Sequence, residues 1–356
     1  MDQNTGSDTM PKVIIISQGN QYTGINKYAI NTYKAMENNA ELYFLKFRRT
    51  HGYYDVGIAV EGKFPYGNSI FNPNSVLPDL AYSRFIEFLK IKKKHEAVVH
   101  VSSPHVLRIA PGLDNVVTIH DVSPFLPGAG HNVEYAITKK FYRHYLKYEH
   151  VLTVSDHVKK AVIEMGAEGR VDRVYSYVSD SFVPTGNKGE IKKRYGLPHD
   201  KKLILSVSTN IPRKNLKILP DLLSKLGDEY RLVRIGEGVG NSYVFSPKDE
   251  NQMNELYNAC DLLISPSLDE GFGYPVVEAL KAGLAVAISD IPVHREVAQD
   301  YGHYFDPMSV ADAARAVKET FESYNSEYKR PDDLLSKFSL NNFKDEMTKY
   351  YASVSR

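Results

Sequence analysis

The sequence has little cysteine, almost no net charge and no long apolar run. Cys260 is the only cysteine among 356 residues, which excludes an internal disulfide framework and a cysteine-rich metal site and suits a reducing compartment. Lys and Arg total 44 against 43 Asp and Glu, so binding of nucleic acid through bulk electrostatics is not expected. No apolar stretch approaches the roughly 18 residues of a membrane-spanning helix, so no segment is predicted to cross a membrane.

The first ten residues, MDQNTGSDTM, are polar. They lack the basic start and apolar stretch of a secretory signal peptide. We therefore expect residues 1–10 to be disordered and the protein to be cytoplasmic.

Short apolar runs rich in β-branched residues alternate with helical patterns along the whole chain. Such runs are typical of buried parallel strands, and their alternation with helices predicts a parallel α/β sheet covered on both faces. The predicted strands are residues 12–17, 97–101, 115–120 and 150–155, and then 202–208, 230–236, 261–267 and 284–289. Two consecutive doubly wound units are the simplest interpretation.

A polar stretch, TGNKGEIKKRYG, separates the two series of strands and indicates a linker or a surface helix. A single core rarely grows beyond about 250–300 residues, which also favours two domains. We predict an N-terminal domain over 1–186 and a second domain over 187–339. The helical pattern in 340–356 predicts a final helix that is free to return to the first domain.

Ligands bind at the carboxyl ends of strands in open α/β sheets, so the loops after the strands are the candidate sites. In the segment 265–283 a strand is followed by Gly271 and Gly273, which permit tight turns, and then by a helix whose N-terminus suits a phosphate. Glu270 and Glu278 stand eight residues apart there and are placed to accept hydrogen bonds from hydroxyl groups. A capped surface helix with two solvated glutamates is the alternative interpretation.

Two further strand ends carry chemically suitable residues. Arg213 and Lys214 follow the strand 202–208, where a guanidinium and an ammonium group together suit a diphosphate. His120 and Asp121 follow the strand 115–120. Taken alone, these residues are better explained by a solvated basic turn and a structural histidine.

Taken together, these blocks resemble glycosyltransferase family four. SPSLDEGFGYPVVEALKAG resembles the E-x7-E block of that family, and LILSVSTNIPRKN resembles the block with its phosphate-binding lysine. VTIHDVSPF, VLTVSDHVKKAVIE and TGINKYAINTYKAM are similar to its N-terminal blocks. The resemblance implies the GT-B fold, an α/β architecture with two Rossmann-like doubly wound domains that face a central cleft.

The resemblance also implies roles for the residues of the E-x7-E block. Glu278 would bind the ribose hydroxyls of a nucleotide, and Glu270 would contact the sugar of the donor. Backbone amides of Phe272, Gly273 and Tyr274 would line the sugar–phosphate site.

The other blocks imply the remaining roles. Lys214, helped by Arg213, would neutralise the leaving diphosphate, and His120 would contact the sugar near the reacting carbon. Gly24 would let its loop approach the phosphates. Many family members carry an arginine six residues before the lysine, where this chain has Ser208, so Arg213 is the candidate for the second cation.

The function implied is that of a retaining hexosyltransferase that uses a nucleotide-diphosphate sugar and a glycan, lipid-linked or other hydroxyl acceptor. No two aspartates are separated by a single residue, so the D-x-D metal clamp is absent and no metal or other cofactor is expected. A sugar phosphorylase on the same architecture and a non-catalytic nucleotide- or sugar-binding scaffold are the alternatives. Segments 88–97 and 139–150 combine basic and aromatic residues, which leaves peripheral membrane contact open beside solvated helices.

Overall fold

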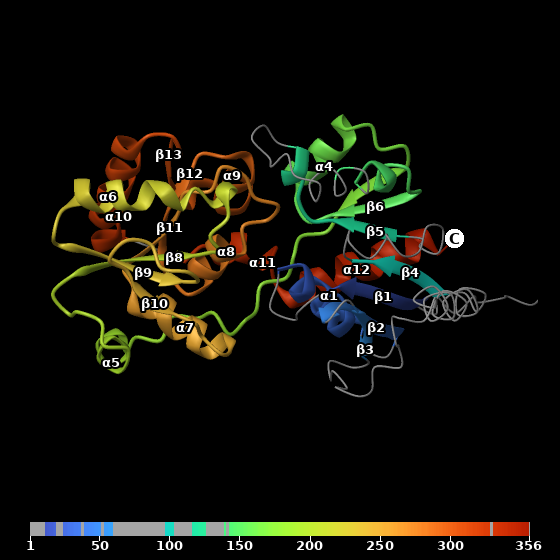
Figure 1. The fold of residues 1–356 in the computed structure, drawn as a ribbon, viewed down its shortest axis with the longest axis horizontal. Helices are drawn as coiled ribbons and strands as arrows, with labels where there is room; N and C mark the ends of the chain where they lie inside the picture. Colours follow the sequence, from blue (N-terminus) through green and yellow to red (C-terminus); the bar gives the residue numbers. More distant parts are fainter. Residues whose placement is uncertain are drawn as a thin grey trace, which may run out of the picture. The chain divides into compact units, whose positions relative to one another are not determined.

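The fold is described from a computed structural model of the chain (Figure 1). The structure describes residues 11–18, 24–36, 39–50, 53–59, 97–102, 116–125, 139, 142–327 and 330–355. Contacts divide the chain into two compact units. Unit 1 comprises Met1–Val154, Val158–Tyr177 and Asn341–Arg356, and unit 2 comprises Ser155–His157 and Val178–Leu340.

Unit 1 is built on a seven-stranded sheet in the order β3-β2-β1-β4-β5-β6-β7. Every neighbouring pair is parallel except β2 and β3, which are antiparallel. The strands are β1 (Lys12–Gln18), β2 (Ala40–Thr50), β3 (Tyr53–Ala59), β4 (Ala97–Val101), β5 (Val116–Ile119), β6 (His150–Thr153) and β7 (Arg170–Arg173).

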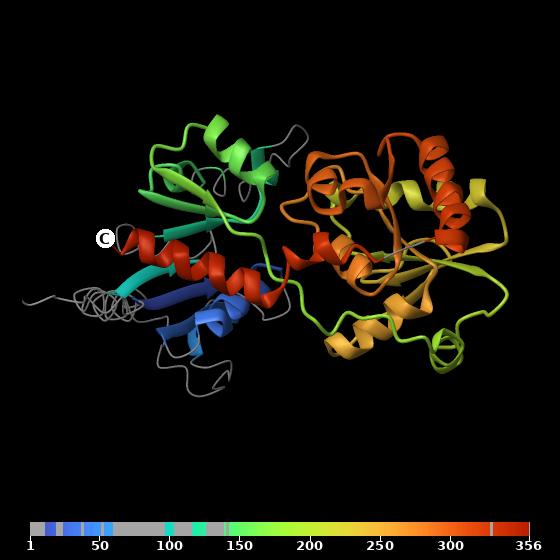
Figure 2. The ribbon, with the colours of Figure 1, turned by 180° about the vertical axis from the view of Figure 1, so that it is seen from behind.

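Helices cover both faces of this sheet. Helix α1 (Gly24–Met36) packs on β1 and β2, and α12 (Leu340–Val354) lies beside it, as Figure 2 shows. On the other face, α4 (Asp156–Glu164) and the segment 142–148 pack on the apolar side chains of β1, β4 and β5.

The basic and aromatic segment 139–150 has its tyrosines inside the protein. Tyr142, Tyr145 and Tyr148 are buried in the core of unit 1, whereas Arg143 and His144 are exposed. These tyrosine rings are therefore not available to a lipid surface. Of the segment 88–97, only Ala97 lies within the described residues. No described helix is long and apolar enough to span a membrane.

Unit 2 is built on a six-stranded, wholly parallel sheet in the order β10-β9-β8-β11-β12-β13. The strands are β8 (Lys202–Val207), β9 (Tyr230–Ile235), β10 (Tyr243–Phe245), β11 (Leu262–Ser265), β12 (Ala285–Ser289) and β13 (Gly302–Phe305). The direction of winding reverses between β8 and β11, which is where doubly wound sheets bind their ligands.

The helices of unit 2 also lie on both faces. Helices α6 (Leu219–Leu226) and α10 (Val310–Glu327) contact each other over a core that includes Ile204, Ile264 and Phe305. Helix α8 (Tyr274–Lys281) packs on β11 and β12 and against α9 (Pro292–Ala298). The remaining described helices are α5 (Lys188–Arg194), α7 (Glu250–Ala259) and α11 (Asp332–Ser336), with 3-10 turns η3 (Ser123–Phe125), η4 (Pro212–Lys214), η5 (Leu216–Ile218) and η6 (Gln299–Tyr301).

The division between the units differs from the sequence-based boundary. The chain enters unit 2 at Val178 rather than at residue 187: the N–H of Val178 donates to the carbonyl of Phe338 at 3.1 Å, and the carbonyl of Val178 accepts from Lys281 Nζ at 2.7 Å. The polar stretch 186–196 contains α5, whose Ile191 is buried. The final helix α12 belongs to unit 1. Its Met347 accepts a hydrogen bond from Tyr28 Oη at 3.8 Å, and Tyr351 Oη lies 2.6 Å from His100 Nδ1.

Candidate active site

The loops after β8 and β11 meet at the point where the sheet of unit 2 reverses its winding. The first loop forms the turn η4, which ends at Asn215 in the left-handed conformation with a φ of 52°. The second loop runs from Ser265 to α8. The backbone N–H of Leu268 donates to the carbonyl of Arg213 at 2.8 Å, so the two loops are hydrogen-bonded to each other.

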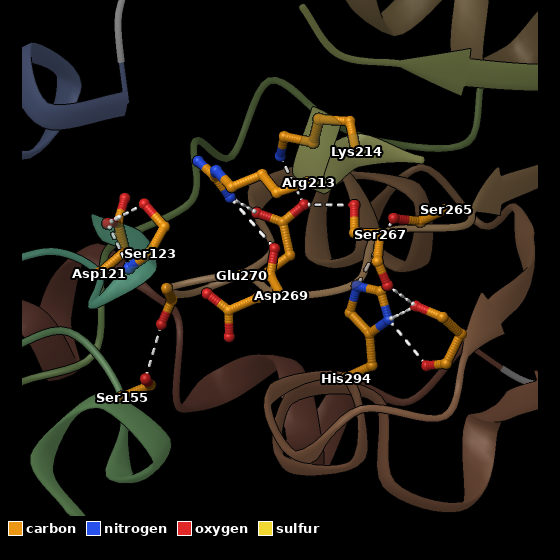
Figure 3. Close-up of polar contacts among 12 residues, drawn as sticks. Asp121, Ser123, Ser155, Arg213, Lys214, Ser265, Ser267, Asp269, Glu270 and His294 are labelled. Carbon is orange, nitrogen blue, oxygen red and sulfur yellow. Dashed lines mark hydrogen bonds and ion pairs between the residues drawn. The ribbon is translucent and has the colours of Figure 1, made fainter. Parts of the chain in front are cut away.

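Two cations converge on one carboxylate between these loops (Figure 3). Lys214 Nζ donates to Glu270 Oε1 at 2.5 Å, and Arg213 Nη1 donates to Glu270 Oε2 at 3.2 Å. The same arginine nitrogen also donates to the carbonyl of Asp269 at 3.1 Å. Ser267 Oγ donates to Glu270 Oε1 at 2.7 Å. We call Arg213, Lys214 and Glu270 the charged cluster.

The electrostatics of the charged cluster keep Glu270 ionised. Burial raises the pKa of this carboxyl group, but the charges of Lys214 and Arg213 outweigh burial and hold the pKa at about 2. The side chain of Glu270 is only 8% exposed, so water screens these charges poorly. With Glu270 ionised, the cluster keeps one net positive charge, so it is suited to bind an anion.

A buried histidine lies behind the cluster. His294 Nδ1 lies 2.9 Å from the carbonyl oxygen of Ser289, which can only accept, so this nitrogen carries the proton. Ser289 Oγ in turn donates to the carbonyl of Ser267 at 2.5 Å, and Ser265 Oγ lies 3.5 Å from His294 Nε2. Burial lowers the pKa of His294, which favours the neutral ring. The histidine thereby connects the ends of β11 and β12 beneath Glu270.

The second glutamate of the block is also held in place. Glu278 lies on α8 with 3% of its surface exposed, and its Oε2 accepts a hydrogen bond from Tyr257 Oη at 2.8 Å. Tyr257 belongs to α7, so this bond joins two helices of unit 2. Burial and the charge of Glu278 raise the pKa of Tyr257 well above its ordinary value, so the phenol keeps its proton.

The segment between the two glutamates makes a tight turn into α8. Gly273 precedes the helix with a φ of 85°, a conformation that favours glycine. The ring of Phe272 packs edge-on against Tyr274 and Phe338, with ring centroids 5.0 and 5.5 Å apart. These contacts fix the path of the backbone whose amides, by the family resemblance, would line the sugar–phosphate site.

The predicted residues of unit 1 lie at the ends of its own strands. His120 follows β5, its Nε2 lies 2.7 Å from the carbonyl oxygen of Ser102 after β4, and its ring meets Tyr28 edge-on at 5.1 Å. Burial lowers the pKa of His120 to about 4, so the ring is neutral near pH 7. Asp121 Oδ1 accepts from Ser123 Oγ at 2.7 Å, and Gly24 is the first residue of α1.

The structure brings Arg213, Lys214 and Glu270 into direct contact and places Phe272, Gly273, Tyr274 and Glu278 on the same loop and helix as Glu270. Sequence reasoning missed Ser267, Tyr257 and His294. Ser267 had a signal, since it lies three residues before Glu270 in the same block. Tyr257 had none, because its partner Glu278 lies on another helix. His294 had none, because its place between the ends of β11 and β12 depends on how α9 packs. Within the part of the chain that the structure describes, no group of three or more His, Cys, Asp or Glu is arranged to hold a metal ion.

Comparison with known sequences shows which proteins this chain resembles. Residues 187–334 match the family "Glycosyl transferases group 1". The chain is 24% identical over 368 residues to the O-antigen chain mannosyltransferase RfbU of Salmonella typhimurium, a match that covers 94% of this chain and 97% of RfbU. It is 30% identical over 209 residues to the serotype-specific mannosyltransferase WbdA of Escherichia coli, covering 50% of this chain and 25% of WbdA.

Solved structures share the fold. Anabaena HepE in complex with UDP-glucose aligns with a TM-score of 0.73 at 13% identity, over 96% of this chain and 100% of HepE. WaaG, a glycosyltransferase involved in lipopolysaccharide biosynthesis, aligns with a TM-score of 0.64 at 16% identity, over 96% of this chain and 95% of WaaG. The prediction of the GT-B fold is thereby confirmed.

Proposed function

We propose that this glycosyltransferase of group 1 transfers a hexose, namely mannose, with retention of anomeric configuration from a nucleotide-diphosphate sugar to a hydroxyl group of a glycan or lipid-linked glycan, without a metal ion. The glycosyltransferase assignment follows from the family match over residues 187–334. The donor, the stereochemistry and the metal independence are the proposed part.

The charged cluster is the observation that carries the proposal. A sugar transferred from a nucleotide diphosphate leaves behind a diphosphate whose negative charge grows as the bond breaks. Lys214 and Arg213 stand at the reversal point of the sheet, where doubly wound sheets bind their ligands, and their positive charge stabilises the negative charge that develops. Because the charge is stabilised more in the transition state than in the ground state, these side chains accelerate the reaction.

The two glutamates supply the hydroxyl-binding groups of the proposed site. Glu270 stays ionised and Glu278 is positioned by Tyr257, so both offer carboxylate oxygens to sugar or ribose hydroxyls. With two cations at the diphosphate, the proposed reaction needs no metal, and the leaving phosphate accepts the proton of the acceptor hydroxyl. The roles of His120 and Gly24 stay predictions from the family resemblance.

The choice of mannose rests on the relatives. RfbU matches this chain along nearly its whole length, and both RfbU and WbdA are described as mannosyltransferases. RfbU is described as acting on an O-antigen chain, which favours a glycan acceptor here. Their similarity supports a mannosyl donor and a growing glycan as the first substrates to test.

The test is thermal unfolding of the full chain with UDP, GDP, ADP, dTDP and their sugars, each with and without EDTA. A ligand at a hundred times its Kd stabilises the fold by about 2.7 kcal/mol, which is easily measured. Stabilisation by one base in both conditions, and transfer of mannose from its nucleotide sugar, is the expected result. NMR of the product then reads the anomeric configuration.

Each other outcome contradicts a named part of the proposal. Stabilisation that disappears with EDTA contradicts metal independence. Stabilisation only by inorganic phosphate and sugar phosphates would replace the transferase with a phosphorylase. Nucleotide binding without turnover of any sugar nucleotide would indicate a non-catalytic scaffold. An inverted product would contradict retention.

A further inference from the structure

A buried arginine lies beside the segment that carries the two cations of the charged cluster. Arg234 is the fifth residue of β9, and none of its surface is exposed. In the register of the sheet it stands opposite Ser206 of β8. A charged side chain in this position is costly unless hydrogen bonds satisfy its donors.

The guanidinium group is satisfied by neutral oxygens. Arg234 Nη1 donates to Ser206 Oγ at 2.8 Å and to Ser208 Oγ at 3.4 Å, and Nη2 donates to the carbonyl of Ser208 at 2.7 Å. Its Nε donates to the carbonyl of Glu237 at 3.1 Å. The carboxylate of Glu237 interacts with Arg234 only electrostatically, without a hydrogen bond. Glu237 is exposed to water, which screens its charge.

These bonds fix the start of the loop that leads to the cluster. Ser208 is the first residue after β8, and Arg213 and Lys214 end the same short segment. The carbonyl oxygen of Ser208 also lies close to Gly236, where an added Cβ would be 2.2 Å from that oxygen. The far end of the segment is held by Asn215, whose Nδ2 donates to the carbonyl of Pro307 at 2.8 Å.

We propose that Arg234 is a positioning residue for diphosphate binding: its planar guanidinium group holds Ser206 and Ser208 so that residues 208–214 present Arg213 and Lys214 to the phosphates. This inference rests on the proposed function. Lysine cannot replace arginine here, because a single ammonium group cannot reach four acceptors in the plane of a guanidinium fork. A purely structural role predicts a different result, in which substitution lowers Tm but leaves ligand binding by the folded protein unchanged.

The experiment compares Arg234→Lys and Arg234→Met with Arg231→Lys and Arg231→Met. Arg231 is a matched control, because it lies on the same strand and its Nη1 donates only to the backbone carbonyls of Asp228 and Tyr230. Calorimetry gives the Kd of each folded variant for the nucleoside diphosphate that binds the wild-type chain among UDP, GDP, ADP and dTDP, and for the matching nucleoside. Steady-state assays give the KM for the donor and kcat.

Both Arg234 variants are expected to bind the diphosphate about tenfold more weakly, with nucleoside affinity within about twofold of wild type, as expected for lost hydrogen bonds to a charged group. The donor KM rises and kcat falls. The Arg231 variants keep wild-type values. A folded Arg234→Lys protein with wild-type diphosphate affinity and kcat would overturn the proposal.

Two further measurements keep the result decisive. If neither Arg234 variant folds, Ser206→Ala removes one acceptor and is expected to weaken diphosphate binding about threefold. Wild-type affinity in that variant would then contradict the positioning role. If the wild-type chain itself binds no nucleoside diphosphate, the proposed function fails first, and the two failures are thereby distinguished.

Discussion

Lys214 and Glu270 form a salt bridge of 2.5 Å in which the two side chains are only 13% and 8% exposed. The residues come from different loops of unit 2, one after β8 and one after β11. In a nearly buried pair, removing one partner leaves the other charge uncompensated. The pair therefore affects both the stability of the site and its chemistry, and the two effects are separated by experiment.

Replacing Lys214 by alanine is expected to lower turnover at least about tenfold while the protein remains folded. In the proposed reaction, the substitution removes a positive charge that is needed most as the diphosphate leaves. The measurement is kcat with the donor that stabilises the wild-type chain, together with circular dichroism. Lys217→Ala is the control, since Lys217 is exposed on the adjacent turn. Near wild-type turnover of Lys214→Ala would remove this residue from the site.

Glu270→Gln is expected to reduce stability at neutral pH but much less in acid. A carboxyl group whose folded pKa is lowered contributes stability that is present above its unfolded pKa and is lost as pH falls towards the folded value. The folded pKa of Glu270 is about 2 and its ordinary value is about 4.3, which corresponds to about 3 kcal/mol at pH 7. Denaturant unfolding between pH 7 and pH 3 measures the difference between variant and wild type.

The difference in unfolding free energy should shrink steadily below about pH 4.5. A difference that stays constant down to pH 3 would show that the charge of Glu270 does not stabilise the fold. The same variant should also be severely impaired in turnover, because a neutral amide replaces the carboxylate at the proposed sugar contact. Wild-type kinetics would exclude Glu270 from the site.

Tyr257→Phe tests whether Glu278 needs its helix partner. The change removes only the hydroxyl that donates to Glu278 Oε2, and we expect a loss of about 1.5–3 kcal/mol in unfolding free energy. The donor KM should rise, since the carboxylate loses its fixed position. Tyr243→Phe, at an exposed tyrosine, is the control. If the donor KM of Tyr257→Phe equals that of wild type, Glu278 is not positioned through this bond.

The burial of His100 makes the stability of unit 1 depend on pH. It is completely buried between Tyr351 Oη and Thr118 Oγ1, each 2.6 Å from a ring nitrogen, and burial lowers its pKa to about 3. The unfolded chain binds a proton at about pH 6.5, so stability is lost as pH falls below that value, by about 1.4 kcal/mol per pH unit.

His100→Gln should reduce the pH dependence of the unfolding free energy between pH 6.5 and pH 4.5 by about 1.4 kcal/mol per pH unit, while the buried His120 keeps its own contribution. Glutamine keeps a donor and an acceptor but does not titrate. His199→Gln is the control, because it makes the same substitution at a histidine that is exposed to water. An unchanged slope in His100→Gln would contradict the burial of a neutral ring at this position.

The sequence predicted the elements whose pattern is local. The apolar runs identified β1, β4, β5, β6, β8, β9, β11 and β12, and Pro275 with Gly283 bracketed α8 to within a residue. The strands that it missed lie at or near the sheet edges. Arg170–Arg173 forms β7 from a polar sequence, and Tyr243–Phe245 forms β10 from three residues, neither of which gives an apolar run.

The site residues also fall into those that the local sequence identifies and those that only the packing reveals. Arg213, Lys214 and Glu270 were identified because each follows a recognisable strand in a compact block. Tyr257 and His294 could not be identified, because their contacts depend on how α7 and α9 pack. Arg234 interrupts the apolar sequence YRLVRIG, and a charge in a buried strand was a signal that sequence reasoning did not use.

The position of α12 has a consequence for synthesis on the ribosome. Unit 1 is assembled from three separate segments, and its third segment, Asn341–Arg356, is translated after all of unit 2. Phe343, Met347 and Tyr351 fill the core of unit 1 from that segment, so this core cannot close until that segment has been made. Most of unit 2 is one continuous stretch and is complete earlier. Unit 2 therefore has its full set of residues before unit 1 does, and nascent unit 1 exposes apolar surface until Asn341–Arg356 has been translated.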